Sequence, residues 1–439
     1  MGPRRRSAGV FTKDKPLITR MATTRTKCFA LLASALISMA SAAFAQDSGP
    51  LLDLLVKKGI VNDQEAENLR AELARDSSAA VVSTISGGKS TVGLSISGRL
   101  QVQYADLGGK IDGASTSLVA TNHFFMRRVY LGAKAALGNG WTGNFNYDFA
   151  GSTFDQAFIQ WRKDDTLAVD VGLRKVPFGL EEWYTSSGSL KAIERSPATR
   201  YFVESNNGRR LGAGSYRVGV FVGGKLPSGL FYNVALTDPE RDETFSGVAG
   251  AGSNTNNNFA YWGNLGFSQK VAGTWTYTVS SSAGYLPDQG GPAATGLGKG
   301  DGLTVFNAFF DVTNGAFDVQ AEYFGSDNHH GVSATQNSKG NGYSLQSSYM
   351  IDKFEPVIRY AIVNSDHRGV ALSDGIRSAP SGGTMDKMSE LFLGANYYLR
   401  GNDVKLQAGY IYGESKDTVT GGAAKAKTQG FRSQLQVNF

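Results

Sequence analysis

Residues Trp141 to Ala150 read WTGNFNYDFA, and their side chains alternate between apolar and polar. The apolar side chains share one face with Gly143 and are Trp141, Phe145, Tyr147 and Phe149. The polar side chains take the other face and are Thr142, Asn144, Asn146 and Asp148. Because successive side chains of a β-strand point to opposite faces, this period of two predicts a strand with one apolar and one polar face.

The same alternation continues to the end of the chain. In the last segment Phe431, Leu435, Val437 and Phe439 oppose four polar side chains, and a C-terminal aromatic residue that closes such a strand resembles the assembly signal of outer-membrane proteins. Sixteen such segments begin near Thr91, His123, Trp141, Phe154, Leu167, Ser215, Leu230, Asn258, Trp275, Leu303, Ala316, Gly342, Phe354, Met388, Val404 and Lys427.

The links between these segments are sorted by length. Short links follow the even-numbered segments, as at Asn314–Gly315, and long links follow most odd-numbered ones, as at residues 177–210. Only the link near Gly151–Ser152 departs from this rule. A soluble sandwich has no reason to sort its loops, whereas an outer-membrane barrel has short turns at one rim and long loops at the other. We therefore expect an all-β fold, a sixteen-stranded antiparallel transmembrane β-barrel over residues 91–439.

The basic excess of the chain belongs to its N-terminal segment. The 439 residues hold 44 Lys and Arg against 38 Asp and Glu, but eight bases and one acid lie within residues 1–45. The remainder is balanced, so nucleic acid is not an expected partner. A secretory signal is expected at residues 21–45, with an apolar run Cys28–Met39 and a cleavage site before Gln46, which leaves residues 1–20 as an extra N-terminal stretch. Cys28 is the only cysteine, so the mature chain has no thiol.

Residues 46–90 are expected to form a short helical periplasmic segment and a linker. Leu51–Lys58 has the composition of a short helix, and a second helix is expected to begin at Asn62. Such short helices are marginal alone, so they pack on another element or self-associate, as a trimeric coil or as a tethered hairpin. Residues 77–90 are rich in small side chains and are expected to be the linker.

The link at residues 177–210 is too irregular for a strand and too interrupted by Pro and Gly for one helix, so we expect a long functional loop. From Arg174 to Arg210 it carries a net charge of +3. The alternation also sends wall cations into the lumen: Arg99, Arg128, Lys134, Arg174, Arg217, Lys225, Arg359 and Lys405. Arg127 shares the parity of Val129 and Leu131, which places it on the lipid side or at a bend. Each cation is either paired with an inward acid, such as Asp148 or Glu390, or part of a ring that selects anions.

Four motifs resemble those of the phosphate-selective porin O/P family: HFFMRRVYLGAKAAL (123–137), VGLRKVPFGLEE (171–182), AIERSPATRY (192–201) and GRRLGAG (208–214). The stretch SGRLQVQYAD (97–106) resembles the opening strand of that family. The resemblance implies a homotrimer of sixteen-stranded barrels in which the third long loop folds inward as an arginine-lined constriction. By these motifs, the resemblance implies that the main residues of the constriction or of an arginine ladder along the pore are Arg99, Arg127, Arg128 and Arg195. One departure is the absence of arginine from residues 259–264, which implies a sparse arginine ladder.

We therefore expect an outer-membrane porin that takes up phosphate or other small anions, with lipid and lipopolysaccharide around it and its N-terminal segment in the periplasm. The expected pore residues are Arg99, Arg127, Arg128, Arg174, Lys191, Arg195, Arg200, Arg209 and Arg210. A general diffusion porin and a barrel adhesin are the alternatives. No enzyme site or cofactor is expected, because the chain has no Gly-x-Ser-x-Gly sequence and its four histidines lie at strand edges or in loops. His329 and His330 could hold a metal weakly, but exposed loop histidines usually hold none, so no metal site is expected.

Overall fold

The computed structural model describes residues 80–87, 90–112, 117–204, 211–239, 258–271, 274–287, 289–291, 301–371, 384–417 and 425–439. The chain divides into two compact units, Met1–Leu54 and Leu55–Phe439, and all described residues belong to the second. No helix in the described ranges is long and apolar enough to cross a membrane. The expected extra stretch, signal and helical segment at residues 1–79 lie outside the described residues.

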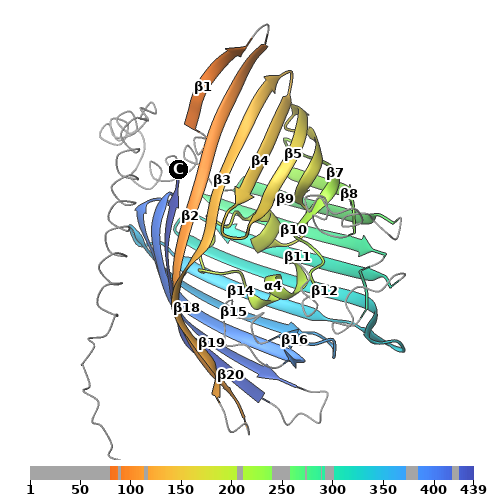
Figure 1. The fold of residues 1–439 in the computed structure, drawn as a ribbon, viewed down its shortest axis with the longest axis vertical. Helices are drawn as coiled ribbons and strands as arrows, with labels where there is room; N and C mark the ends of the chain where they lie inside the picture. The colour runs from red at the N-terminus through yellow and green to blue at the C-terminus, as the bar shows by residue number, and fades with distance from the viewer. Residues whose placement is uncertain are drawn as a thin grey trace, which may run out of the picture. The chain divides into compact units, whose positions relative to one another are not determined.

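Sixteen strands form a closed antiparallel barrel, because each pairs with the next along the chain and the last pairs with the first (Figure 1). They are β2 (Ser90–Ile111), β3 (Ser117–Gly138), β4 (Trp141–Asp148), β5 (Thr153–Asp164), β6 (Leu167–Lys175), β7 (Tyr216–Lys225), β8 (Leu230–Thr237), β9 (Ala260–Val271), β10 (Trp275–Leu286), β11 (Leu303–Thr313), β12 (Phe317–Ser333), β14 (Asn341–Tyr349), β15 (Phe354–Asn364), β18 (Lys387–Arg400), β19 (Val404–Lys416) and β20 (Lys425–Asn438). The expected barrel fold is confirmed.

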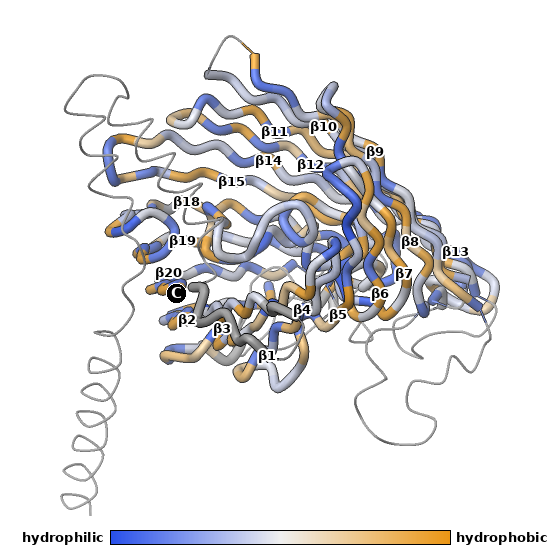
Figure 2. Tube along the Cα trace, turned by 90° about the horizontal axis from the view of Figure 1, so that it is seen from above, coloured by the Kyte–Doolittle hydropathy of each residue, from blue (hydrophilic) through white to orange (hydrophobic). Residues whose placement is uncertain are grey.

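The two faces of the wall follow the sequence alternation, which Figure 2 shows as alternating colours along β10 to β15. In the β19–β20 pair, Lys405 lies opposite Gln436 and both are buried inside, whereas Leu406 lies opposite Leu435 and both are more than 40% exposed. Apolar groups on the outer face are stable only against lipid, and the polar groups inside need water or one another.

The barrel closes tightly at the C-terminal residue. The backbone of Phe439 donates to the carbonyl of Gly98 at 3.1 Å, and the Gly98 amide donates back to the Phe439 carbonyl at 2.6 Å. The short turns between neighbouring strands have the residues that their backbone conformation requires. In the β3–β4 turn Asn139 has φ 51° and Gly140 has φ 80°, the left-handed pair that a two-residue hairpin turn requires.

Short accessory strands lie outside this ring. β1 (Ala80–Gly87) pairs only with β2, and β13 (Gln336–Ser338) extends the β12–β14 hairpin. β16 (Val370–Ala371) and β17 (Thr384–Met385) pair with each other. The described part of the expected linker thus forms a strand, β1. Its sequence AVVSTISG is rich in β-branched residues, which favour an extended backbone.

Candidate functional site: the loop inside the barrel

The loop between β6 and β7, described over residues 176–204 and 211–215, folds into the barrel there and carries two short helical turns. η1 (Leu180–Tyr184) is a π-helical turn, and α4 (Pro197–Phe202) is a six-residue α-helix. The sequence sets the start of α4, because the Ser196 side chain accepts a hydrogen bond from the Thr199 amide and Pro197 occupies the first helical turn. All six residues of α4 are buried.

One side of this loop packs on apolar side chains that point inward from the wall. Phe178 contacts Trp262 of β9 and Phe324 of β12, with ring centroids 5.9 and 5.7 Å apart. Phe202 stacks on Phe324 with centroids 5.4 Å apart and rings nearly parallel. Tyr201 belongs to the same cluster and is 1% exposed. This cluster, hereafter the loop core, holds α4 against the wall beside β12, β14 and β15 (Figure 1).

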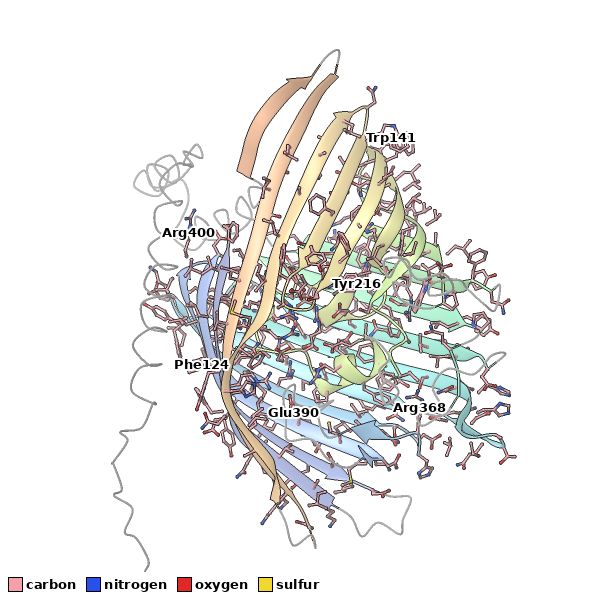
Figure 3. All side chains as sticks on the ribbon, viewed as in Figure 1. Phe124, Trp141, Tyr216, Arg368, Glu390 and Arg400 are labelled. Carbon is pink, nitrogen blue, oxygen red and sulfur yellow. The ribbon has the colours of Figure 1, made fainter. Side chains whose placement is uncertain are left out.

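Buried carboxylates hold the polar side of the loop. Glu181 Oε1 lies 3.1 Å from Arg359 Nη1 of β15, while its Oε2 accepts hydrogen bonds from the Ser196 amide (2.7 Å) and the Thr199 hydroxyl (2.8 Å). Arg359 also pairs with Glu390 of β18 at 3.0 Å. One carboxylate therefore joins η1, the start of α4 and the wall. Figure 3 places Glu390 and Tyr216 among the side chains inside the barrel.

The loop cations that the sequence singled out are paired in the same way. Arg195 lies 2.6 Å from Glu182 and 3.8 Å from Glu204, and its side chain is 6% exposed. Arg200 lies 3.5 Å from Glu204. Burial lowers the pKa of Arg195, but the carboxylates of Glu182 and Glu204 outweigh it and raise that pKa above its ordinary value. Both guanidiniums are therefore neutralised within the loop.

Lys191 joins the loop to two strands. Its Nζ lies 2.8 Å from Glu355 of β15 and 3.4 Å from Asp318 of β12, and it donates to the Ser348 hydroxyl at 3.0 Å. Burial lowers the pKa of Lys191, but these two carboxylates raise it more, so the pKa lies above its ordinary value. This lysine is also a paired cation.

A bulge in β3 explains how both arginines of the Arg127–Arg128 pair face inward. Gln101 of β2 pairs with Arg128 and the next residue, Val102, pairs with Met126, so Arg127 is the extra residue. Arg127 is 8% exposed, and its guanidinium binds both carboxylate oxygens of Glu194 at 2.5 and 3.0 Å. The parity argument for the lipid face is therefore wrong for Arg127, and its alternative of a bend is correct.

Three predicted wall cations differ in how they are compensated. Arg174 pairs with Asp170 and lies over the ring of Phe158. Arg128 is 2% exposed and donates to the Gln101 side chain at 2.7 Å. Arg99 donates to Asn438 (2.8 Å), Ser187 (2.6 Å) and Ser186 (3.2 Å). Neither Arg99 nor Arg128 has a carboxylate within 4 Å in the described part of the chain, and Arg209 and Arg210 lie outside it.

A family model described as phosphate-selective porin O and P matches residues 95–439. The chain belongs to this family. The resemblance drawn from the sequence motifs is thereby confirmed, and the protein is an outer-membrane porin channel.

Solved structures show the same barrel fold. An anion-selective porin from Comamonas acidovorans is 12% identical with a TM-score of 0.52, covering 79% of this chain and 100% of its own. OprB of Pseudomonas putida is also 12% identical, with a TM-score of 0.50 and coverage of 79% and 94%. At these identities the likeness concerns the fold alone. A comparison with curated proteins finds no match.

The residues of this porin that sequence reasoning missed are the carboxylates of the loop. Its described part, 176–204 and 211–215, holds three basic and four acidic residues, and all four acids are buried. Arg432 of β20, fully buried and 3.6 Å from Glu194, was also missed. The inward parity of Arg432 was visible in the sequence, but its partner was not. Of the two inward acids considered as partners of wall cations, Glu390 pairs with Arg359, whereas Asp148 accepts hydrogen bonds from the Val129 and Ala150 amides.

Proposed function

We propose that this porin is an anion-selective channel for phosphate or related oligophosphate anions, narrowed by the loop between β6 and β7. The observation that carries the proposal is the pair Arg99 and Arg128 on β2 and β3. Neither has a carboxylate within 4 Å among the described residues, whereas Arg127, Lys191, Arg195 and Arg200 each have one at 2.5–3.5 Å.

The surroundings of the two arginines suit an anion. Gln101, which takes the Arg128 hydrogen bond, lies two residues from Arg99 on the same face of β2. The Ser186 and Ser187 hydroxyls of the loop lie against Arg99 and can donate to an arriving oxygen. A guanidinium presents a planar fork of donors that matches phosphate oxygens and stays charged at all physiological pH values. Rings of such cations select anions in narrow pores.

A general diffusion porin is the second candidate, and the extent of ion pairing favours it. A cation 2.6–2.8 Å from a carboxylate, as in Arg195–Glu182 and Lys191–Glu355, contributes little field at a distance. If the lumen field comes only from neutralised pairs, the channel passes small solutes of either sign. The two candidates differ in whether Arg99 and Arg128 control permeability.

Reversal potentials across planar bilayers under a KCl gradient test this difference. Arg99→Gln and Arg128→Gln should each lower the chloride-over-potassium permeability ratio about fivefold, because one charge at contact contributes about 1 kcal/mol in water. Added phosphate should block chloride current in the native channel and less in either variant. Arg400→Gln is the matched control, since Arg400 is the last residue of β18, its side chain is 82% exposed, and it lies outside the lumen (Figure 3). Unchanged ratios in both lumen variants, with no phosphate block, would establish the diffusion porin.

We also infer that the porin is a homotrimer in a lipid and lipopolysaccharide environment. An apolar groove on the outer wall supports this, because its small side chains let a neighbouring barrel approach closely. The groove is lined by the small residues Ala133, Ala135, Gly143 and Ala157 and by larger ones that include Leu94, Phe145, Ile159 and Val171. Crosslinking of the folded porin in detergent, followed by electrophoresis without boiling, should give a species of three chains. A single-chain species at all crosslinker concentrations would contradict the trimer.

A further inference from the structure

At the rim that carries the long loops, Asp301, His329 and His330 bring three metal-binding side chains together. Asp301 comes just before β11, and the two histidines lie near the end of β12. One ligand atom from each residue lies within 4.8 Å of the other two. The lumen cations described above take no part in this cluster.

The contacts within the cluster converge on one oxygen. Asp301 Oδ1 lies 3.0 Å from His329 Nδ1 and 2.7 Å from His330 Nδ1. The two imidazole rings have centroids 3.8 Å apart and are tilted by 41° to each other. Two neutral imidazoles can each donate one hydrogen to this oxygen, but that arrangement leaves two rings crowded on one acceptor at an exposed site, where water would serve each ring as well.

The backbone holds the three residues in place. The Gly290 amide donates to the Asp301 carbonyl at 2.6 Å, the His329 amide donates to the Gly302 carbonyl at 2.9 Å, and the Gly291 amide donates to the His329 carbonyl at 2.9 Å. His330 has φ 54°, a left-handed conformation that is uncommon for a residue other than glycine. The side chain of Asn337 supports it by accepting from its amide at 3.0 Å. A strained residue fixed by its neighbours is a recurrent feature of binding sites.

We propose that Asp301, His329 and His330 form a binding site for a divalent transition-metal ion, with Zn²⁺ as the probe of choice. Imidazole nitrogen and carboxylate oxygen are ligands that Zn²⁺ takes at about 2.0–2.2 Å, which places neighbouring ligand atoms of a tetrahedral site about 3.3 Å apart. The two N–O distances of 2.7 and 3.0 Å need to open by only about 0.3–0.6 Å to reach that spacing. Water would complete the coordination, because the His329 side chain is 50% exposed.

Such an ion would join two segments of the rim. Asp301 belongs to the link between β10 and β11, and the histidines belong to the β12 hairpin, so a bound ion ties the two together. The site offers two imidazole nitrogens and one carboxylate, a ligand set that suits Zn²⁺. Mg²⁺ and Ca²⁺ prefer several oxygen ligands, so they should not compete with Zn²⁺ for the site. The site is independent of the proposed anion selectivity of the lumen.

Calorimetric titration of the full chain in detergent, freed of metal by a chelator, tests the proposal. Zn²⁺ should bind with one site per chain. His329→Ala, His330→Asn and Asp301→Asn should each weaken binding about tenfold or more, as loss of one ligand or its support does. Asn is chosen at position 330 because it tolerates the left-handed backbone. Electrophoretic migration before boiling verifies that each variant keeps its barrel.

His367→Ala is the matched control. His367 also lies beside a carboxylate, that of Asp386, at 3.6 Å. Among the described residues, however, it is not part of a group of three metal-binding side chains. Its loss should leave Zn²⁺ affinity unchanged. A native chain that releases no heat with Zn²⁺, or an affinity equal in the native chain and all three site variants, would overturn the proposal. Electron paramagnetic resonance of the Cu²⁺ form should show two nitrogen ligands, and a spectrum without nitrogen coupling would also count against it.

Discussion

Glu194 is the loop carboxylate that lies between two wall arginines. Its Oε1 lies 2.5 Å from Arg127 Nε and 3.6 Å from Arg432 Nη1, and its side chain is 7% exposed. Gln103 also donates to it at 2.8 Å. Glu194→Gln keeps the size of the side chain and removes its negative charge. We expect this substitution to add one net positive charge to the lumen wall beside Arg127, and this charge should act on permeating ions.

The magnitudes decide whether the loop stays in the barrel. Removing one partner of a buried ion pair costs about 3–5 kcal/mol. The loop core opposes this loss with Phe178, Tyr201 and Phe202, each less than 2% exposed and each worth about 2 kcal/mol of burial, together about 6 kcal/mol. Glu181, with its own three partners, is untouched. The loop therefore remains docked, and the change in net charge dominates the phenotype.

The assay is the reversal potential under a KCl gradient. The chloride-over-potassium permeability ratio should rise about fivefold, since one charge at contact in water is worth about 1 kcal/mol. Single-channel conductance should change far less than the ratio. Glu414→Gln is the control, because Glu414 is 38% exposed and lies 3.8 Å from Lys427. A ratio that stays constant or falls in Glu194→Gln, with migration before boiling unchanged, would refute the reasoning.

Three further predictions concern the loop and the leader. Phe202→Ala removes the ring that stacks on Phe324 with centroids 5.4 Å apart, which destabilises the docked loop by about 3–5 kcal/mol and should raise single-channel conductance. Tyr360→Ala, on the lipid face, is the control and should leave conductance unchanged. Equal conductance in the two variants would show that the loop does not narrow the channel. Lys191→Met should lower the temperature of barrel unfolding at neutral pH. The pKa of Lys191 in the folded chain is raised above 10.5, so its stabilisation is complete below pH 10.5 and is lost as the pH rises through the folded pKa. The difference in unfolding temperature between the variant and the native chain should therefore close at higher pH. A difference that stays constant across this range would contradict the pairing. Finally, N-terminal sequencing of the outer-membrane protein should begin at Gln46, and a start before Ala45 would contradict the signal assignment.

Local patterns determined the barrel and the direction of its side chains. The period-two alternation, the sorted link lengths and the turn residues predicted sixteen antiparallel strands, and the same parity correctly placed Arg359 and Lys405 inside, where they are 2% and 0% exposed. These features could be read from the sequence because each depends on residues within one strand or one turn.

The charge state of the lumen was decided only by the tertiary structure. The sequence showed a basic loop, but Glu194 reaches Arg127 across 67 residues and Glu181 reaches Arg359 across 178, and no local pattern links such positions. The bulge at Arg127 likewise arises from the register between β2 and β3 rather than from either strand alone. The alternation of a strand specifies which face a side chain takes, whereas closure of the barrel around the loop specifies which charge it meets.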